Sequence, residues 1–369
     1  MAYVQDRGKQ FQGRRWRVRW RGPDGAEHAK SFALKGDADR YCRDVATRLD
    51  RGDHVDPARG KVTIREWGDL WLSTLQPPVV KPSTYESYKS LLTSVVYPTF
   101  GEWPLASIRQ SDVTAWVAGL ASSGMSASRV RQAHGQLAKL LDAAVGDERI
   151  SRNRARGVKL PALPKRPRRR YLTHEQVHAL AAASKTPDLV FVLGYCGLRF
   201  GEAAALDVAD LVGNRLIVRR SVTEINGRHV WGTPKGGEPR EVPVPAFLRE
   251  ILRVSTRGRS GPMFPAPNGG IIRRGNWRRR SFDPAVEATG LGPLSPHDLR
   301  HTAASLAISA GANVLVVARM LGHADPAVTL SVYAELFSDD LDTVADALDE
   351  AASKVHLGAK VTRLRLVRD

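Results

Sequence analysis

The sequence predicts a multidomain protein that is mainly α-helical and contains small β-sheets. Three observations lead to this fold class: a length of 369 residues, strand-like runs near residues 14–21 and 214–244, and helical apolar spacing through most of the remainder. We expect a sheet-plus-helix domain over residues 1–60, a helical domain over 61–155, a basic linker over 156–170, a mixed α+β domain over 171–350 and a C-terminal tail over 351–369.

Residues 14–21 alternate arginine with apolar side chains, which is typical of a half-buried strand. The apolar face would carry Trp16, Val18 and Trp20, and the opposite face Arg15, Arg17, Arg19 and Arg21. A turn at residues 22–25, a second strand over 27–32 and a helix near 38–49 complete the first domain. The arginine face is either ordinary solvated charge or a surface that meets DNA, and the basic chain favours DNA.

Residues 61–155 show helical patterns. Thr63–Glu66 and Ser83–Glu86 both match the capping box and predict helix starts. Apolar spacing continues from Tyr85 to Val95, is broken at Phe100–Pro104, and resumes in two further helices near 113–117 and 130–145. These apolar stripes are interpreted as core.

The segment 151–170 has nine Lys or Arg residues, three prolines and no acidic residue. We expect it to run extended and not to pack as a core element. It is either a solvated linker or a segment that follows DNA phosphates, and mutual repulsion of its charges favours the second reading. Its candidate DNA contacts are Arg166, Arg168, Arg169 and Arg170.

The net charge of +18 indicates a polyanionic partner, with nucleic acid foremost. Two cysteines, Cys42 and Cys196, cannot form a disulfide framework or a cysteine-rich zinc site, so no metal or other cofactor is expected. The longest apolar stretch, Leu189–Leu198, is too short to span a membrane, and no signal peptide is apparent at the N-terminus. We therefore expect a cytoplasmic protein without a membrane partner.

Four polar clusters in the last domain place charge beside apolar sequence. In the first, Arg199 follows a hydrophobic run, and Glu202 at position i+3 can pair with it. In the second, residues 233–243 predict a hairpin that presents Lys235 at its tip.

The third cluster places His297 and Arg300 three residues apart, hence on one face of a helix. In the fourth, His323 precedes a helix start at Asp325-Pro326, and that helix carries Tyr333. Each cluster alone has a structural explanation. Together they supply several cationic donors for a phosphate and one hydroxyl nucleophile.

From about residue 61 to 350 the chain resembles the tyrosine recombinases, or phage-type integrases. The resemblance is sharpest at Gly197–Leu206, Thr233–Pro243, Pro296–Thr302 and Leu321–Tyr333. It implies an N-terminal three-stranded-sheet-plus-helix arm-binding domain, a helical core-binding domain and a catalytic domain of the DNA breaking–rejoining type. A small departure is Asn153-Arg154, where relatives often have Asn-Pro.

The resemblance also implies a role for each cluster. Arg199 and Arg300 correspond to the arginines that grip the scissile phosphate, and Lys235 to the lysine that protonates the leaving 5′ oxygen. His297 and His323 correspond to the two histidines that act in phosphate stabilisation and proton transfer, and Glu202 to an acidic residue that supports the site. Tyr333 corresponds to the nucleophile, which forms a 3′-phosphotyrosyl link.

The implied function is site-specific integration, and possible excision, of a phage or mobile element in a bacterial cytoplasm, at the nucleoid. The implied partners are core-type and arm-type attachment sites, three further copies of the chain in a tetramer on DNA, an excisionase or directionality factor, and a host DNA-bending protein. Residues 335–350 carry seven acidic side chains and form either a solvated helix or, as the resemblance implies and we predict, a contact with a neighbouring protomer. Two alternatives stay open: a type IB topoisomerase-like enzyme and a non-catalytic DNA-binding regulator.

Overall fold

The structure is a computed structural model that describes residues 2–8, 13–22, 25, 27–50, 59–164, 170–234, 236–323 and 325–333, together with residues 345, 346, 348–350, 352 and 353. The chain divides into two compact units, Met1–Lys165 and Arg166–Asp369. Among the described residues, no helix is both long and apolar enough to cross a membrane.

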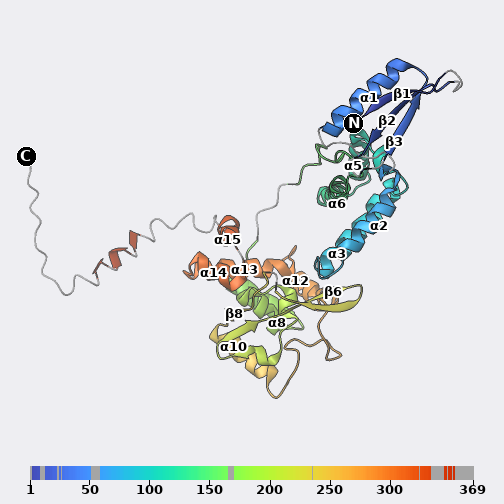
Figure 1. Ribbon diagram of the computed structural model, residues 1–369. Coiled ribbons are helices and arrows are strands. Elements are labelled where there is room, and N and C mark those ends of the chain that lie inside the picture. The colour runs from blue at the N-terminus through green and yellow to red at the C-terminus, as the bar shows by residue number, and fades with distance from the viewer. Residues whose placement is uncertain are drawn as a thin grey trace, which may run out of the picture. The chain divides into compact units, whose positions relative to one another are not determined.

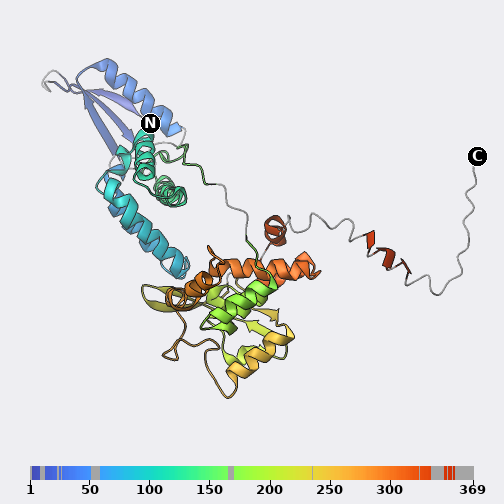
Figure 2. The same ribbon diagram turned by 180° about the vertical axis from the view of Figure 1, so that it is seen from behind.

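The described residues among the first fifty form a three-stranded antiparallel sheet covered by one helix (Figures 1 and 2). Its strands β1 (Tyr3–Asp6), β2 (Trp16–Arg21) and β3 (Glu27–Phe32) lie in the order β1-β2-β3, and α1 (Lys35–Asp50) packs on one face. Val18 and Trp20 are buried against Ala38 and Val45. The predicted strand, its facing and the predicted helix are therefore confirmed.

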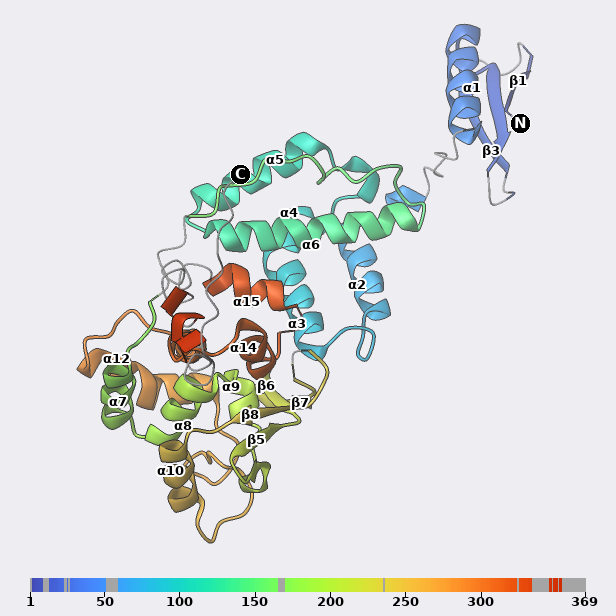
Figure 3. The same ribbon diagram turned by 90° about the vertical axis from the view of Figure 1, so that its left-hand side faces the viewer.

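A second apolar core lies among the helices that follow. These are α2 (Ile64–Thr74), α3 (Pro82–Leu91) with a π-helical turn at Leu92–Val96, α4 (Tyr97–Phe100), α5 (Gln110–Ser122) and α6 (Ala127–Gly146), with 3₁₀ turns at Arg59–Lys61 and Leu105–Ser107. Figure 3 shows α5 and α6 side by side, and their contacts agree.

The two predicted helix caps have different outcomes. The capping box of Thr63 and Glu66 is present, with each side chain accepting the other's backbone N–H. The cap predicted at Ser83 is wrong, because α3 begins at Pro82 and Lys81 occupies the N-cap position without a side-chain hydrogen bond. Proline is favoured in the first turn, where its missing N–H has no partner in any case.

The start of the basic segment packs on this core, so the expectation that residues 151–170 stay unpacked is wrong for its first half. Ala155 is fully buried, and Val158 and Leu160 lie against the helical core. The Asn153 side-chain amide donates to the carbonyl of Ala138 at 2.8 Å, which ties the segment to α6. Apolar residues between the charges bring this stretch down onto the helices.

The second unit combines helices with two small sheets. Its elements are α7 (His174–Ala183), α8 (Pro187–Phe191), a π-helical turn at Val192–Cys196, α9 (Phe200–Ala203), a 3₁₀ turn at Val208–Asp210, β4 (Leu211–Val212), β5 (Arg215–Val218), β6 (Ser221–Ile225), β7 (Arg228–Gly232), β8 (Arg240–Pro243), α10 (Ala246–Thr256), α11 (Arg274–Trp277), a π-helical turn at Arg278–Phe282, α12 (Asp283–Ala288), α13 (Pro296–Ser309), α14 (Val314–Leu321) and α15 (Pro326–Tyr333). The apolar run from Leu189 to Leu198 lies in the core, and α13 packs against its π-helical turn.

The strands form one sheet in the order β4-β5-β8 and a separate hairpin of β6 and β7. The hairpin turn falls at Asn226-Gly227, with φ of 49° and 72°. The hairpin predicted over residues 233–243 is wrong, because β7 and β8 belong to different sheets. Strand β8 pairs with β5 instead, which buries Val242 beside Leu216, so residues 233–239 connect the two sheets.

Candidate active site

A buried carboxylate organises the polar centre of the second unit. The Glu202 side chain is 1% exposed, and its carboxylate accepts the backbone N–H of Arg199 at 2.9 Å, which caps the start of α9. The same carboxylate accepts Nη1 of Arg199 at 2.9 Å, as the i+3 spacing predicted. A buried ion of this kind needs partners on both oxygens.

Arg240, at the start of β8, supplies the second partner. Its Nη1 and Nη2 donate to the two Glu202 oxygens at 3.1 and 2.6 Å. Burial raises the pKa of Glu202, but the hydrogen bonds and charge of Arg240 and then Arg199 outweigh it, so the net pKa lies below the ordinary value. Glu202 is therefore ionised near neutral pH.

Arg300 lies beside this pair, on α13, and its side chain is held by backbone carbonyls. Nη1 donates to Gly197 and Nη2 to Leu321, both at 2.6 Å, and the residue is 2% exposed. Burial and then repulsion from Arg199 lower the pKa of Arg300 to about 9. Three guanidinium groups thus surround one carboxylate, and the excess positive charge suits an anion.

Gly197 is required where it stands. Its φ of +64° is in the left-handed region, and a Cβ there would lie 2.7 Å from Cδ2 of Leu321. This turn directs the Gly197 carbonyl at Arg300 and leads the chain into Arg199.

His323 follows the end of α14 and is fixed by a hydroxyl from α15. Its Nδ1 lies 2.7 Å from Oγ1 of Thr329, which is fully buried. Burial, and then the charges of Arg300 and Arg199, lower the pKa of His323 to about 4. The imidazole is neutral at physiological pH, and in the tautomer in which Nδ1 accepts from Thr329, Nε2 carries the hydrogen and can donate to a phosphate.

Tyr333 ends α15 and is 1% exposed. Its hydroxyl lies 2.8 Å from Nδ1 of His301, and its ring lies 6.0 Å from that of Tyr171. His301 in turn meets the exposed His297 edge-on, with ring centroids 4.8 Å apart. His301 follows Arg300 directly on α13, so this contact brings Tyr333 to the helix that carries one member of the arginine cluster, which consists of Arg199, Arg240 and Arg300.

The structure therefore brings together Arg199, Glu202, His297, Arg300, His323 and Tyr333, which sequence reasoning had singled out. Lys235 lies outside the described residues. Sequence reasoning assigned no role to Arg240, His301 or Thr329. His301 was detectable, since it lies one helical turn after His297.

The predicted arginine face of β2 is open to solvent but partly paired within the sheet. Arg15 donates through Nε to Asp6 at 2.7 Å, and this hydrogen bond lowers the pKa of Asp6 to about 2. Arg19 and Arg21 lie 3.2 and 3.7 Å from Glu27. Arg17 has no acidic partner among the described residues, so its charge is the most available for a phosphate.

The predicted linker contacts fall mostly outside the described residues, where Arg166, Arg168 and Arg169 lie. Arg170 is described, and its Nη1 lies 3.4 Å from the carbonyls of Leu291 and Gly292. Arg170 is exposed, and these contacts fix its guanidinium group to the second unit.

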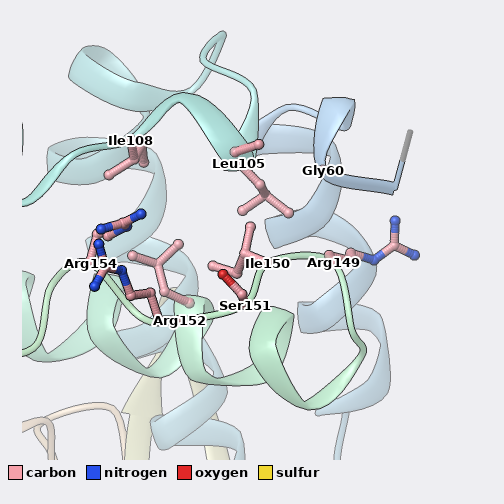
Figure 4. A pocket seen from close by; sticks show the side chains of 10 residues that line it. Gly60, Leu105, Ile108, Arg149, Ile150, Ser151, Arg152 and Arg154 are labelled. Carbon is pink, nitrogen blue, oxygen red and sulfur yellow. The ribbon is translucent and has the colours of Figure 1, made fainter. Parts of the chain in front are cut away.

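A pocket of about 160 Å³ lies in the first unit, between the turns at Arg59–Lys61 and Leu105–Ser107 and the segment 149–154 (Figure 4). Figure 4 shows Arg149 directed away from Arg152 and Arg154, and its guanidinium lies 4.5 Å from the ring of Trp67. This pocket contains none of the residues of the arginine cluster.

Comparisons with known proteins agree with this fold. Residues 170–339 match the phage integrase family, and residues 63–121 match the phage integrase N-terminal SAM-like domain. A prophage phiRv2 integrase sequence of Mycobacterium tuberculosis is 28% identical over 87% of this chain and 89% of its own length. The tyrosine recombinase XerD of Pseudomonas aeruginosa is 32% identical over 47% of this chain and 59% of its own length.

Solved structures show the same fold. The Tn1549 transposon integrase, in complex with a circular intermediate DNA, has a TM-score of 0.64 at 19% identity and covers 73% of this chain and 95% of its own. A lambda integrase tetramer bound to a Holliday junction has a TM-score of 0.60 at 18% identity, covering 90% of this chain and 94% of its own. The chain belongs to the phage integrase family of tyrosine recombinases, and it is a site-specific DNA recombinase.

Proposed function

We propose that this recombinase integrates a phage or mobile element by cleaving and rejoining DNA strands through Tyr333. The observation that carries the proposal is the grouping of cationic donors with a tyrosine: Arg199 pairs with buried Glu202, Arg300 donates to the carbonyl two residues before His323, and Tyr333 bonds the residue that follows Arg300. These donors suit the charge of a single phosphodiester, and the Tyr333 hydroxyl is the proposed nucleophile once it leaves its contact with His301.

In the proposed reaction, Oη of Tyr333 attacks the scissile phosphorus, and the bond to the 5′ oxygen breaks. The Tyr333 proton goes to a nearby histidine, His297 or His301, and the leaving 5′ oxygen takes a proton from Lys235. The product is a 3′-phosphotyrosyl ester and a free 5′ hydroxyl. Attack of a 5′ hydroxyl from another strand reverses these steps and rejoins the DNA.

The cationic donors act on charge that develops on the non-bridging oxygens. Arg199 and Arg300 hold those oxygens, and neutral His323 donates through Nε2. Removing one preorganised donor of this type costs roughly 10²–10³ in rate, or about 3–4 kcal/mol. Glu202 supports Arg199 and does not itself meet the phosphate.

The other parts of the chain would bind the DNA around this centre. We assign arm-type sites to residues 1–60, core-type sites to 61–155 and the catalytic domain, and backbone contacts to the basic linker over 156–170. The lambda integrase tetramer on a Holliday junction supports a homo-tetramer for this chain as well. The acidic segment 335–350, most of which lies outside the described residues, would contact a neighbouring protomer.

Two partners complete the proposal: an excisionase or directionality factor, and a host DNA-bending protein. Both would act on the same DNA in the bacterial cytoplasm. Their recruitment would decide between integration and excision.

The decisive experiment incubates the purified full-length chain with pairs of DNA duplexes that carry different labels. The duplexes are taken from overlapping segments of the DNA that flanks the coding sequence, so that an attachment site in this DNA is included. Joint molecules that carry both labels, with protein bound covalently to the 3′ side of the break, support recombination. Relaxation of supercoiled DNA without joint molecules would instead indicate the topoisomerase-like activity. Binding without any covalent product would indicate a regulator.

A further inference from the structure

Arg240 connects three elements that sequence reasoning treated separately. Besides its two bonds to Glu202, it donates through Nε to the carbonyl of Met320 at 2.9 Å. Its side chain is 11% exposed, and it joins the start of β8, the N-terminus of α9 and the C-terminal end of α14. The segment that leads to His323 is thereby fixed against the strand that follows Lys235.

The glycine next to this contact leaves room for the guanidinium. Gly322 has a φ of +67°, and a Cβ there would lie 3.1 Å from three atoms of the Arg240 side chain. The backbone of the residue before His323 is therefore shaped around Arg240.

The geometry at Glu202 has a consequence for Arg199. Arg240 engages both carboxylate oxygens, whereas the Arg199 side chain contributes one bond, from Nη1 to Oε1. Within the described residues, Nε and Nη2 of Arg199 make no hydrogen bond, and its side chain is 24% exposed. Without Arg240, Glu202 would be a buried carboxylate with one cationic partner, and a bidentate pair with Arg199 would then be the favoured arrangement.

We propose that Arg240 is a positioning residue for the recombinase reaction: by holding Glu202 at both oxygens, it keeps Nε and Nη2 of Arg199 available for the scissile phosphate and fixes the approach to His323. This inference rests on the proposed role of Arg199 as a phosphate donor. Arg240 itself need not touch the DNA.

The test compares single-turnover formation of the covalent adduct at saturating DNA for wild type, Arg240→Gln and Arg240→Lys in the full-length chain. We expect Arg240→Gln to lower the rate constant about 100-fold, in the range found for loss of one preorganised donor, with little change in the DNA concentration that gives half-saturation. Arg240→Lys restores at most about a tenth of the wild-type rate, because an ammonium group cannot form the planar bidentate pair.

A second substrate separates this role from a general weakening of the fold. Replacing one charged oxygen of the scissile phosphate by a methyl group removes part of what Arg199 would hold. On this substrate, the cleavage rate constant of Arg240→Gln should be less than about tenfold below that of wild type. The reason is that a donor contributes its roughly 10²–10³ in rate only where charge develops on the phosphate oxygen. A purely structural defect would lower the cleavage rate constant by the same factor on both substrates.

Two further variants complete the design. Arg273→Gln is the matched control, because Arg273 also pairs with a carboxylate in the same unit, Glu224 at 2.6 Å, and donates to a carbonyl, that of Gly227. It should cleave at the wild-type rate. Glu202→Gln combined with Arg240→Gln removes the buried charge together with its partner, so it should fold even if Arg240→Gln does not, and should recover at least tenfold over Arg240→Gln where that variant folds.

The outcomes are distinct. The inference is overturned if a folded Arg240→Gln cleaves at the wild-type rate, or if its cleavage rate constant falls by the same factor on both substrates. Should Arg240→Gln fail to fold, a folded double variant that is as slow as Arg199→Ala also overturns it. If wild type forms no adduct at all, the proposed function fails instead.

Discussion

Nδ1 of His301 lies 2.8 Å from the hydroxyl of Tyr333, and only 1% of the tyrosine is exposed to solvent in this position. A hydroxyl this deeply buried cannot reach the phosphate of a DNA duplex unless it moves. The contact with His301 and the ring of Tyr171 therefore define a stored position beside the arginine cluster.

Removing the His301 contact should make Tyr333 more accessible. A net hydrogen bond is worth about 1 kcal/mol, or roughly a fivefold change in an equilibrium. We expect His301→Phe, which keeps a ring but has no nitrogen, to raise the rate of Tyr333 nitration about fivefold, as measured by peptide mass spectrometry in the absence of DNA. An unchanged rate, with Tyr171 as internal reference, would contradict the stored position.

Stability should depend on His323 in acid. Its pKa of about 4 in the folded chain lies below the ordinary value of 6.5 that it has when unfolded. Between pH 6.5 and 4 the unfolded state binds more protons, so the free energy of unfolding falls as the pH drops through this window. Urea unfolding at pH 7 and 4.5 should show a larger loss for wild type than for His323→Gln; equal losses would refute the assignment.

Thr329 should act through the same imidazole. Thr329→Val has nearly the same shape but cannot bond Nδ1 of His323, so the ring loses its fixed orientation. We expect about a tenfold slower covalent cleavage and a loss of about 1 kcal/mol in unfolding free energy. Thr329→Ser keeps the hydroxyl and should cleave at close to the wild-type rate; equal defects in both variants would show that the hydroxyl is irrelevant.

Gly197 should be sensitive for two separable reasons. Gly213→Ala is the control, because it tests only the cost of the left-handed backbone: φ at Gly213 is +60°, and nothing lies within 4 Å of an added Cβ. That change should cost about 1–2 kcal/mol. Gly197→Ala adds the clash with Leu321 and should cost about 1–3 kcal/mol more, with slower cleavage because the carbonyl that holds Arg300 shifts. Similar unfolding free energies for the two variants would contradict this reading.

On the N-terminal sheet, Arg17 should matter more than Arg15. Arg15 is paired with Asp6, whereas Arg17 has no acidic partner among the described residues. We expect Arg17→Ala to weaken binding to arm-type DNA and to lower the slope of log affinity against log salt by about one, with core cleavage unchanged. Equal loss of arm binding and core cleavage would end the proposed division of labour.

Local patterns in the sequence were sufficient to predict those features that depend only on the spacing of neighbouring residues. The alternation from Trp16 to Trp20 predicted the buried side of β2, and the i+3 spacing predicted the pair of Arg199 and Glu202. By contrast, Arg240 bonds partners 38 and 80 residues away, so nothing local marks it. The hairpin at 233–243 failed for the same reason, because the pairing of β8 with β5 depends on distant apolar residues.

Tyr333 is the proposed nucleophile, and covalent capture of DNA tests this role directly. Wild type, Tyr333→Phe and Tyr171→Phe should each be incubated with a nicked suicide duplex that carries a cognate core site, and the adduct mapped by peptide mass spectrometry. We predict a DNA 3′-phosphate on Tyr333 in wild type and in Tyr171→Phe, and no adduct in Tyr333→Phe. An adduct formed by Tyr333→Phe, or one that maps to another residue in wild type, would contradict the central claim.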